Sequence, residues 1–367
     1  MYIGELMQAI VLCEPEHLEF MDIPKPALTN DNLVLVAVEA CGICGSDLRY
    51  YKGENPWALH TLGVHKDNPP NMVMGHEFAG TVVKVNSKAY EHLLGKRVGV
   101  QSFRACGTCR FCTSGRENLC PNMFHVGHAQ GWGEMDFYPG AYAEYTLGWG
   151  DLCYPLAEHV SSTEAAMADI ICTAVHIFNK TRFYPGATML CIGGGPIGLA
   201  TAQVALINGT RQVFISDPSD ACRAVASQYK GIQVIDPRNF DVTGFVLDHN
   251  GGKKCAAIVD SVGSNETFTL GVGLLEESGT YVNVALHETD IQFSAMCLAS
   301  ERSVSTSSNS TNSDVREAYD LLNASRINVE PWITYRFGLA DYQKAFDLLL
   351  APTKQAFKVV FEPGITD

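Results

Sequence analysis

Two groups of metal-binding side chains are the parts of this sequence best suited to chemistry. The first follows the pattern C-x2-C-x2-C-x7-C and consists of Cys106, Cys109, Cys112 and Cys120. Four thiolates so closely spaced can enclose one tetrahedral zinc ion with no open coordination position, so this site is predicted to be structural. Two disulfides or four unrelated thiols are the alternatives, and a chain without a secretion signal disfavours both.

The second group is predicted around Cys44 and His76, a thiol and an imidazole that both suit zinc. Glu77 follows His76 directly, and Ser46 lies two residues after Cys44. A carboxylate beside a zinc ion can tune it from outside the coordination shell, and a hydroxyl there could relay a substrate proton. A catalytic zinc also keeps one position open for an oxygen donor.

Asp169 is the predicted third ligand of this catalytic zinc. It stands in an apolar stretch at residues 166–171, where an ionised carboxylate is costly unless a metal or another group compensates it. Cys172 is the competing ligand, and pairing with a base or capping a turn is the structural alternative for Asp169. The C-x-x-C pair of Cys41 and Cys44 is not interpreted as a redox dithiol, because we expect no helix directly after it.

A glycine-rich turn predicts a dinucleotide site. It fits G-x-G-x-x-G and is expected to join a strand at 187–192 to a helix at 197–208, which is the context the motif requires. The first glycine allows the tight turn, the second lets the backbone approach a pyrophosphate, and the third lets the helix pack against the strand. The helix N-terminus then faces the anion. The predicted cofactor-binding residues here are Gly193, Gly195, Pro196, Ile197 and Gly198.

The end of the next predicted strand, at residues 212–217, favours NAD over NADP as the cofactor. Asp217 ends that strand, where a carboxylate can accept hydrogen bonds from ribose hydroxyls and would repel a 2′-phosphate. Arg223 is the one nearby cation that could reach the ribose. It keeps NADP as the alternative cofactor.

The composition is that of an acidic globular protein. The 367 residues are 46% hydrophobic and 18% charged, with a formal net charge of −14. This charge disfavours nucleic acids and anionic membranes as partners, because both require a basic surface. No apolar run is long enough for a transmembrane helix. The thirteen cysteines and the lack of a secretion signal favour a reducing, cytoplasmic location.

The order of predicted elements indicates an α/β fold with two domains. Short valine-rich runs before residue 155 predict a barrel-like β domain whose long loops carry the cysteines and histidines. Apolar strands then alternate with helices, which predicts a doubly wound parallel sheet. The tract 303–313 is expected to be a polar loop. We expect the first domain to comprise residues 1–157 and 297–367, around an inserted nucleotide-binding domain at 158–296.

The chain resembles the medium-chain, zinc-dependent alcohol and polyol dehydrogenases, including the sorbitol and threonine dehydrogenases. The matching segments are residues 41–47, 75–80, 106–120, 139–145, 193–198 and the helices after 314, which together span nearly the whole chain. The resemblance implies a GroES-like catalytic domain and a Rossmann NAD-binding domain. It also implies one catalytic zinc on Cys44, His76 and Asp169, and one structural zinc in the four-cysteine loop.

Three residues depart from the family pattern. Asn86 stands where the pattern after Gly-His-Glu usually has glycine, and asparagine tolerates a left-handed turn better than most residues, so the fold should survive. Polyol and threonine dehydrogenases usually carry Glu where Asp169 stands, so a shorter side chain would have to reach the metal. Arg49 occupies a position where many relatives have a proton-relay histidine, and an arginine cannot shuttle protons at neutral pH. Arg49 is therefore expected to bind an anionic group. Ser46, Arg49 and Tyr50 are the candidates for substrate contact.

Together these features predict hydride transfer between a secondary alcohol, such as a polyol, sugar or cyclitol, and NAD. Zinc would polarise the alcohol oxygen as a Lewis acid, and Ser46 would take the hydroxyl proton. The alternatives are an NADP(H)-dependent oxidoreductase of primary alcohols or aldehydes, and a non-catalytic NAD(P)-binding relative. The expected partner is a small alcohol or ketone, and a homo-oligomer is expected, with a tetramer favoured over a dimer.

Overall fold

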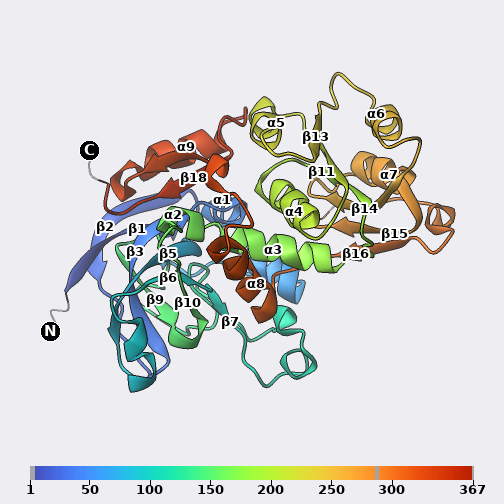
Figure 1. The fold of residues 1–367 in the computed structure, drawn as a ribbon. Helices are drawn as coiled ribbons and strands as arrows, with labels where there is room; N and C mark the ends of the chain where they lie inside the picture. Colours follow the sequence, from blue (N-terminus) through green and yellow to red (C-terminus); the bar gives the residue numbers. More distant parts are fainter. Residues whose placement is uncertain (1–4, 286–287, 289, 366–367) are drawn as a thin grey trace. The chain divides into compact units, whose positions relative to one another are not determined.

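The computed structural model of the protein describes residues 5–365 except 286, 287 and 289 (Figure 1). The chain forms two compact units, Met1–Asp169 with Thr311–Asp367, and Ile170–Ser310. Both boundaries lie later in the chain than the expected ones at 157/158 and 296/297. The reason is that residues 162–165 pack against strands of the first unit, whereas residues 303–306 form a strand in the sheet of the second.

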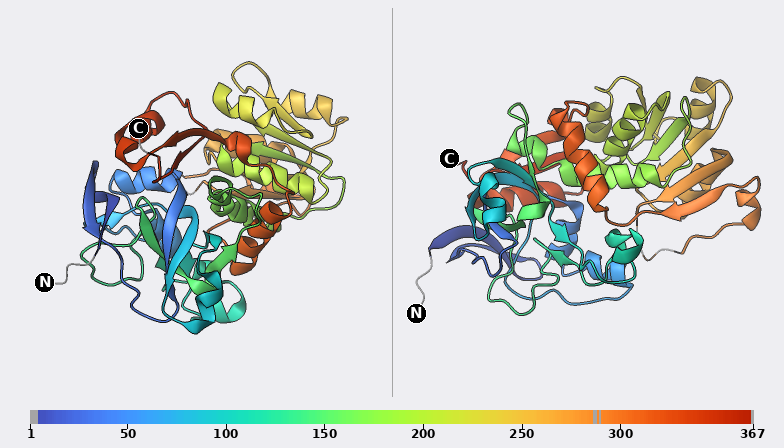
Figure 2. Two further views of the ribbon diagram at one scale, coloured as in Figure 1. Left: turned by 60° about the vertical axis from the view of Figure 1, so that its left-hand side comes forward. Right: turned by 60° about the horizontal axis from the view of Figure 1, so that its bottom comes forward.

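Mostly antiparallel strands build the first unit, with a parallel pair between its last two strands. Its main sheet has the order β10-β6-β5-β3-β18-β17, and β9 also pairs with β3. These strands are β3 (Leu33–Gly42), β5 (Glu77–Val85), β6 (Arg97–Val100), β9 (Tyr145–Trp149), β10 (Cys153–Pro155), β17 (Ile333–Phe337) and β18 (Lys358–Phe361). The C-terminal strand β18 pairs with β3, so the end of the chain returns to the N-terminal sheet (Figure 2).

Smaller elements complete the first unit. A three-stranded sheet and a two-stranded ribbon are formed by β1 (Leu6–Glu14), β2 (His17–Pro24), β4 (Met72–Val73), β7 (Phe103–Arg104) and β8 (Phe124–His125). The helices are α1 (Gly45–Tyr51), α2 (Ser162–Ala165), α8 (Asn312–Asn323) and α9 (Tyr342–Leu350). A buried apolar core that includes Phe78, Tyr142 and Phe361 lies between these elements.

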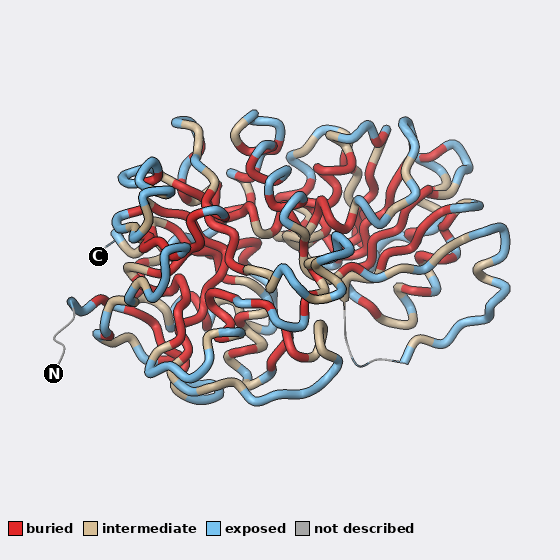
Figure 3. Tube along the Cα trace, turned by 90° about the horizontal axis from the view of Figure 1, so that it is seen from below, coloured by how far each residue is buried: buried red, intermediate tan, exposed pale blue. Residues whose placement is uncertain are grey.

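The second unit is a six-stranded parallel sheet of order β13-β12-β11-β14-β15-β16. Its strands are β11 (Thr188–Ile192), β12 (Gln212–Ser216), β13 (Ile232–Ile235), β14 (Cys255–Asp260), β15 (Leu275–Asn283) and β16 (Ser303–Thr306), and its helices are α4 (Pro196–Ile207), α5 (Asp220–Ala226), α6 (Val242–His249) and α7 (Asn265–Gly273). The central strands are buried along their whole length (Figure 3). The strand order reverses between β11 and β14, and such a switch point is where open α/β sheets bind ligands.

Several elements differ from the sequence-based expectation. The single helix expected over 161–180 is broken into α2 and α3 (Ala168–Asn179). Ser161 and Glu164 form a capping box at the start of the short helix α2. The tract 303–313, expected as a polar loop, contains the edge strand β16 and the start of α8. Its serine and threonine residues alternate between half-buried and exposed positions, so no apolar pattern marked the strand.

Candidate active site

Strand register brings Cys44 and His76 together. In the antiparallel pair β3–β5, Gly42 lies opposite Glu77, so Cys44 just after β3 and His76 just before β5 meet at one edge of the sheet. Cys44 is the N-cap residue of α1, which begins at Gly45. The expectation that no helix follows the Cys41–Cys44 pair is therefore wrong, but Cys41 is fully buried, which raises the pKa of its thiol and disfavours redox exchange.

The metal-binding group at this edge consists of Cys44, His76 and Glu77, whose ligand atoms all lie within 4.8 Å of one another. His76 and Glu77 are buried, and Cys44 is half-buried. A thiolate, an imidazole and a carboxylate at this spacing fit a divalent zinc ion. The structure thus brings Glu77, which we expected to act from outside the coordination shell, among the candidate ligands.

Among the described residues, the candidate metal-binding group does not include Asp169. It lies in the first turn of α3, near enough for neighbouring charges to act on it. Burial raises the pKa of Asp169 to about 6. The negative charges of Glu77 and Asp47 add to that rise, whereas His76 and Lys358 oppose it. Asp169 as a zinc ligand therefore stays a prediction. Cys172, the competing ligand, is buried in α3.

Asp47 orients His76, and the sequence analysis did not identify it. Its carboxylate is fully buried; one oxygen accepts hydrogen bonds from the Cys44 amide (2.9 Å) and the Tyr142 hydroxyl (2.7 Å), and the other lies 3.4 Å from Nδ1 of His76. Burial alone would raise the pKa of Asp47, but the charge of His76 and these hydrogen bonds lower it. A carboxylate behind one imidazole nitrogen leaves the other nitrogen for the metal.

A buried lysine supports Glu77 and was also missed. Lys358 on β18 forms an ion pair with Glu77 and donates a hydrogen bond to the Ile43 carbonyl at 2.8 Å. The two charged side chains are only 4% and 1% exposed. Burial is the largest single influence and favours the neutral lysine, but the charge and hydrogen bond of Glu77, with the charges of Cys44 and Asp47, together outweigh it and raise the pKa of Lys358. The only sequence signal was a lysine in an otherwise apolar final strand.

The three residues predicted to touch substrate have different surroundings. Ser46 on α1 has a buried hydroxyl with no hydrogen-bond partner among the described residues, which suits a group that bonds to substrate. Arg49 is already engaged, because its Nε lies 2.6 Å from Glu54 and its Nη1 lies 3.2 Å from the His60 ring. Tyr50 is fully buried, and its hydroxyl donates to Asn55 at 3.4 Å.

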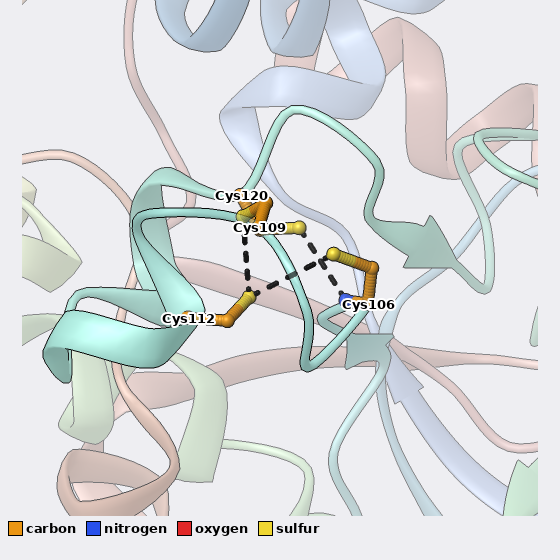
Figure 4. A group of neighbouring side chains, drawn as sticks. All are labelled: Cys106, Cys109, Cys112 and Cys120. Atoms are coloured by element: carbon orange, nitrogen blue, oxygen red, sulfur yellow. Dashed lines mark hydrogen bonds between the residues drawn. The ribbon is translucent and has the colours of Figure 1, made fainter.

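The four-cysteine loop is assembled as predicted for a structural metal site (Figure 4). Ligand atoms of Cys106, Cys109, Cys112 and Cys120 all lie within 4.8 Å of one another. Sγ of Cys112 is 3.5 Å from Sγ of Cys109 and 3.9 Å from Sγ of Cys106, and all four cysteines are free thiols rather than disulfides. Hydrogen bonds from the backbone at Thr108 and Cys109 lower the pKa of Cys106 to about 6, which favours a thiolate ligand.

The glycine turn in the second unit has the geometry its motif predicts. Gly193 has a φ of 95°, and a Cβ at Gly198 would collide with the Gly193 carbonyl oxygen, so both positions need glycine. Gly195 is the N-cap residue of α4, and Pro196 occupies its first turn, followed by Ile197. The amide groups at this helix start are therefore available to an anion.

Asp217 and Arg223 form a fixed network beside this turn. The Asp217 carboxylate accepts hydrogen bonds from the amides of Gly194 (2.7 Å) and Ser219 (2.6 Å). Arg223 donates to the Asp217 carbonyl at 2.7 Å, pairs with Asp220, and lies 3.2 Å from Asp236. Arg223, which could have received a 2′-phosphate, is thus already held by the backbone and by carboxylates.

Comparison with known proteins places these sites in a family. Residues 30–158 match the model of the alcohol dehydrogenase GroES-like domain, and residues 196–324 match that of the zinc-binding dehydrogenases. The chain belongs to the zinc-dependent medium-chain dehydrogenases. The resemblance seen in the sequence and the predicted fold class, a GroES-like domain with a Rossmann domain, are both confirmed.

Curated relatives and solved structures cover almost the whole chain. It is 28% identical to D-xylulose reductase A of Aspergillus niger, over 90% of this chain and 89% of the relative. It is 27% identical to sorbitol dehydrogenase of Halalkalibacterium halodurans, over 95% and 96%. L-Idonate 5-dehydrogenase of Escherichia coli shares the fold with a TM-score of 0.84 at 23% identity, over 98% of each chain.

Proposed function

We propose that this protein is a zinc-dependent dehydrogenase that transfers a hydride between a secondary alcohol, such as a polyol, sugar or cyclitol, and NAD. The observation that carries the proposal is the buried group of Cys44, His76 and Glu77, with ligand atoms within 4.8 Å of one another. The relatives named above, a xylulose reductase and a sorbitol dehydrogenase, support the substrate class.

Some residues of the site are proposed to hold a metal ion, and another to transfer a proton. A zinc ion bound there would supply Lewis acidity toward the substrate oxygen. Cys44 and His76 hold it, Asp47 fixes the orientation of the imidazole, and Lys358 balances the charge of Glu77. The Ser46 hydroxyl would accept the proton of the substrate alcohol while it passes its own proton to the ribose of the cofactor and from there to water. Asp169 is proposed as an additional carboxylate ligand close to this group.

Two zinc ions per chain are proposed, the second in the four-cysteine loop. NAD is favoured over NADP because the Asp217 carboxylate stands at the end of β12, and because Arg223 is bound to Asp220 and Asp236. Arg49, engaged by Glu54, is proposed to stiffen α1 rather than to carry protons.

A cytoplasmic homotetramer, with the first unit as the catalytic domain and the second unit as the cofactor domain, completes the proposal. All thirteen cysteines are free, which suits a reducing compartment. Among the described residues, no helix combines the length and the apolar character needed to cross a bilayer.

The experiment is a panel of polyols, sugars, cyclitols and simple alcohols, each offered with NAD and with NADP, while reduced cofactor is followed by absorbance. Oxidation of secondary polyol hydroxyls with NAD is the expected result. Turnover confined to primary alcohols or aldehydes with NADP(H) would overturn the substrate and cofactor assignments, and no turnover with zinc-loaded protein would overturn the activity itself.

A further inference from the structure

A buried carboxylate at the switch point of the parallel sheet has no role in the function proposed so far. Asp260 is the last residue of β14, it pairs with Ile192 at the end of β11, and it is fully buried. A short loop at residues 261–263 follows and leads to α7, whose N-cap residue is Ser264. Burying a carboxylate is costly unless hydrogen bonds compensate it, so the partners of Asp260 indicate its role.

The carboxylate of Asp260 holds the loop that follows it. One oxygen accepts hydrogen bonds from the amides of Val262 (2.8 Å) and Gly263 (3.1 Å), and the other accepts one from the hydroxyl of Tyr281. The Tyr281 ring is itself fixed, because it is buried and packs against the ring of Phe268 with centroids 5.1 Å apart. Hydrogen bonds to a charged acceptor are stronger than those between neutral groups, so Asp260 holds the loop firmly in one shape.

This loop packs directly on the glycine turn of the dinucleotide site. The amide and the hydroxyl of Ser261 both donate to the Ile192 carbonyl, at 2.9 and 3.1 Å. A Cβ at Gly193 would collide with the Ser261 hydroxyl oxygen, so the first glycine of the motif also leaves room for the loop. At its other end, Gly263 has a left-handed φ of 71°, and a Cβ there would collide with Ala285. The loop is therefore confined on two sides.

The place of the loop in the sheet points to the nicotinamide half of a dinucleotide. β11 lies between β12 and β14, and Asp217 at the end of β12 is the residue expected to meet the adenosine ribose. A dinucleotide that crosses the switch point from there would extend over the carboxyl end of β14, where the loop begins. Val262, in the middle of the loop, leaves 43% of its surface exposed and so offers an apolar contact at this edge.

We propose that Asp260 is a positioning residue for the cofactor: through its hydrogen bonds to the loop at residues 261–263, it fixes the surface on which the nicotinamide ring of NAD binds. This inference rests on the proposed function and assigns to it a residue that acts from beneath the site. It predicts that loss of the carboxylate weakens the binding of the nicotinamide ring. The binding of the rest of the dinucleotide should stay nearly unchanged, because Ser261 is bonded to Ile192 independently of Asp260.

The test compares NADH with ADP-ribose, which lacks only the nicotinamide ring, by calorimetric titration of the zinc-loaded wild type, Asp260→Ala and Asp260→Asn. Alanine leaves two amides and the Tyr281 hydroxyl without their acceptor. We expect it to raise the Kd of NADH about tenfold and that of ADP-ribose less than about twofold. Asparagine keeps one oxygen for the two amides, so Asp260→Asn should recover most of the affinity for NADH.

Asp241→Ala is the matched control, because Asp241 also accepts two backbone amides, those of Thr243 (3.1 Å) and Gly244 (3.0 Å), but at the start of α6. It should lower Tm and leave the ratio of the two Kd values unchanged.

An unchanged ratio in Asp260→Ala, or no recovery in Asp260→Asn, would overturn the inference. If Asp260→Ala does not fold, Tyr281→Phe decides in its place. It keeps the ring and removes one bond to the carboxylate, and it must raise the Kd of NADH but not that of ADP-ribose. A wild type that binds neither ligand would refute the proposed cofactor and this inference with it. Binding without turnover would count against the proposed activity alone, and the comparison would still decide the role of Asp260.

Discussion

Replacing Lys358 with methionine tests the charge balance beneath the metal-binding group. Lys358 and Glu77 form an ion pair in which the lysine is 4% and the glutamate 1% exposed, so almost no solvent screens it. Methionine keeps the unbranched shape and most of the length of the side chain, but it leaves the carboxylate without its cation and the Ile43 carbonyl without its 2.8 Å donor. Breaking a buried pair on one side costs about 3–5 kcal/mol, because an uncompensated charge remains.

The assay is urea unfolding of the zinc-loaded protein, with kcat/KM measured in parallel. We expect the free energy of unfolding of Lys358→Met to fall by about 3–5 kcal/mol, a large share of the stability of a typical domain. Arg104→Met is the matched control. It breaks an ion pair with Asp151 at 2.6 Å whose side chains are 32% and 43% exposed, and it should cost about 1 kcal/mol or less.

A double-mutant cycle decides whether the loss comes from the Glu77 charge. In a Glu77→Gln background, Lys358→Met should lower the free energy of unfolding much less, because no buried carboxylate is left unpaired. Two results would show that the unpaired charge of Glu77 is not the cause. One is a free energy of unfolding that falls no more in Lys358→Met than in Arg104→Met. The other is an equal fall with and without the Glu77 carboxylate.

Three other perturbations probe Asp169, the four-cysteine loop and Asp217. The pKa of Asp169 rises from 3.8 to about 6 on folding, so the stability it contributes is complete below pH 3.8 and is lost as the pH rises through about 6. In metal-depleted protein, Asp169→Asn should therefore gain about 3 kcal/mol over wild type at pH 7 and little near pH 4, and a constant difference in urea titrations would contradict this. Cys120→Ser opens the structural site and should lose one zinc per chain by metal analysis and lower Tm, whereas retention of both ions would count against the site. Asp217→Ala should raise KM for NAD about tenfold and lower the ratio of kcat/KM with NAD to kcat/KM with NADP. An unchanged ratio would show that Asp217 does not select the cofactor.

Local spacing was enough to predict some of the site. The four cysteines lie within fifteen residues, and the structure places their ligand atoms within 4.8 Å. The glycine turn could be predicted because a strand, three glycines and a helix follow one another directly in the chain. Cys44 and His76 are far apart in sequence, but their flanking residues carried enough family pattern to pair them.

Residues whose role depends on long-range packing could not be predicted. Lys358 reaches Glu77 only because β18 pairs with β3 next to β5, a register that no local pattern encodes. Asp47 had no interpretation from the sequence, and its position behind His76 follows only from the fold. The sequence assigned no role to His128, and its position next to His76 depends on the close approach of Gly127 to Gly75. Edge strand β16 was missed because its residues are polar.

The most direct test of the account is zinc analysis of the wild type and Cys44→Ala, combined with turnover and NADH affinity. We predict two zinc ions per chain in the wild type and one in Cys44→Ala, which should lose turnover while its affinity for NADH stays nearly unchanged. A Cys44→Ala protein that keeps two zinc ions and full activity would contradict the assignment of the metal site to Cys44, His76 and Glu77.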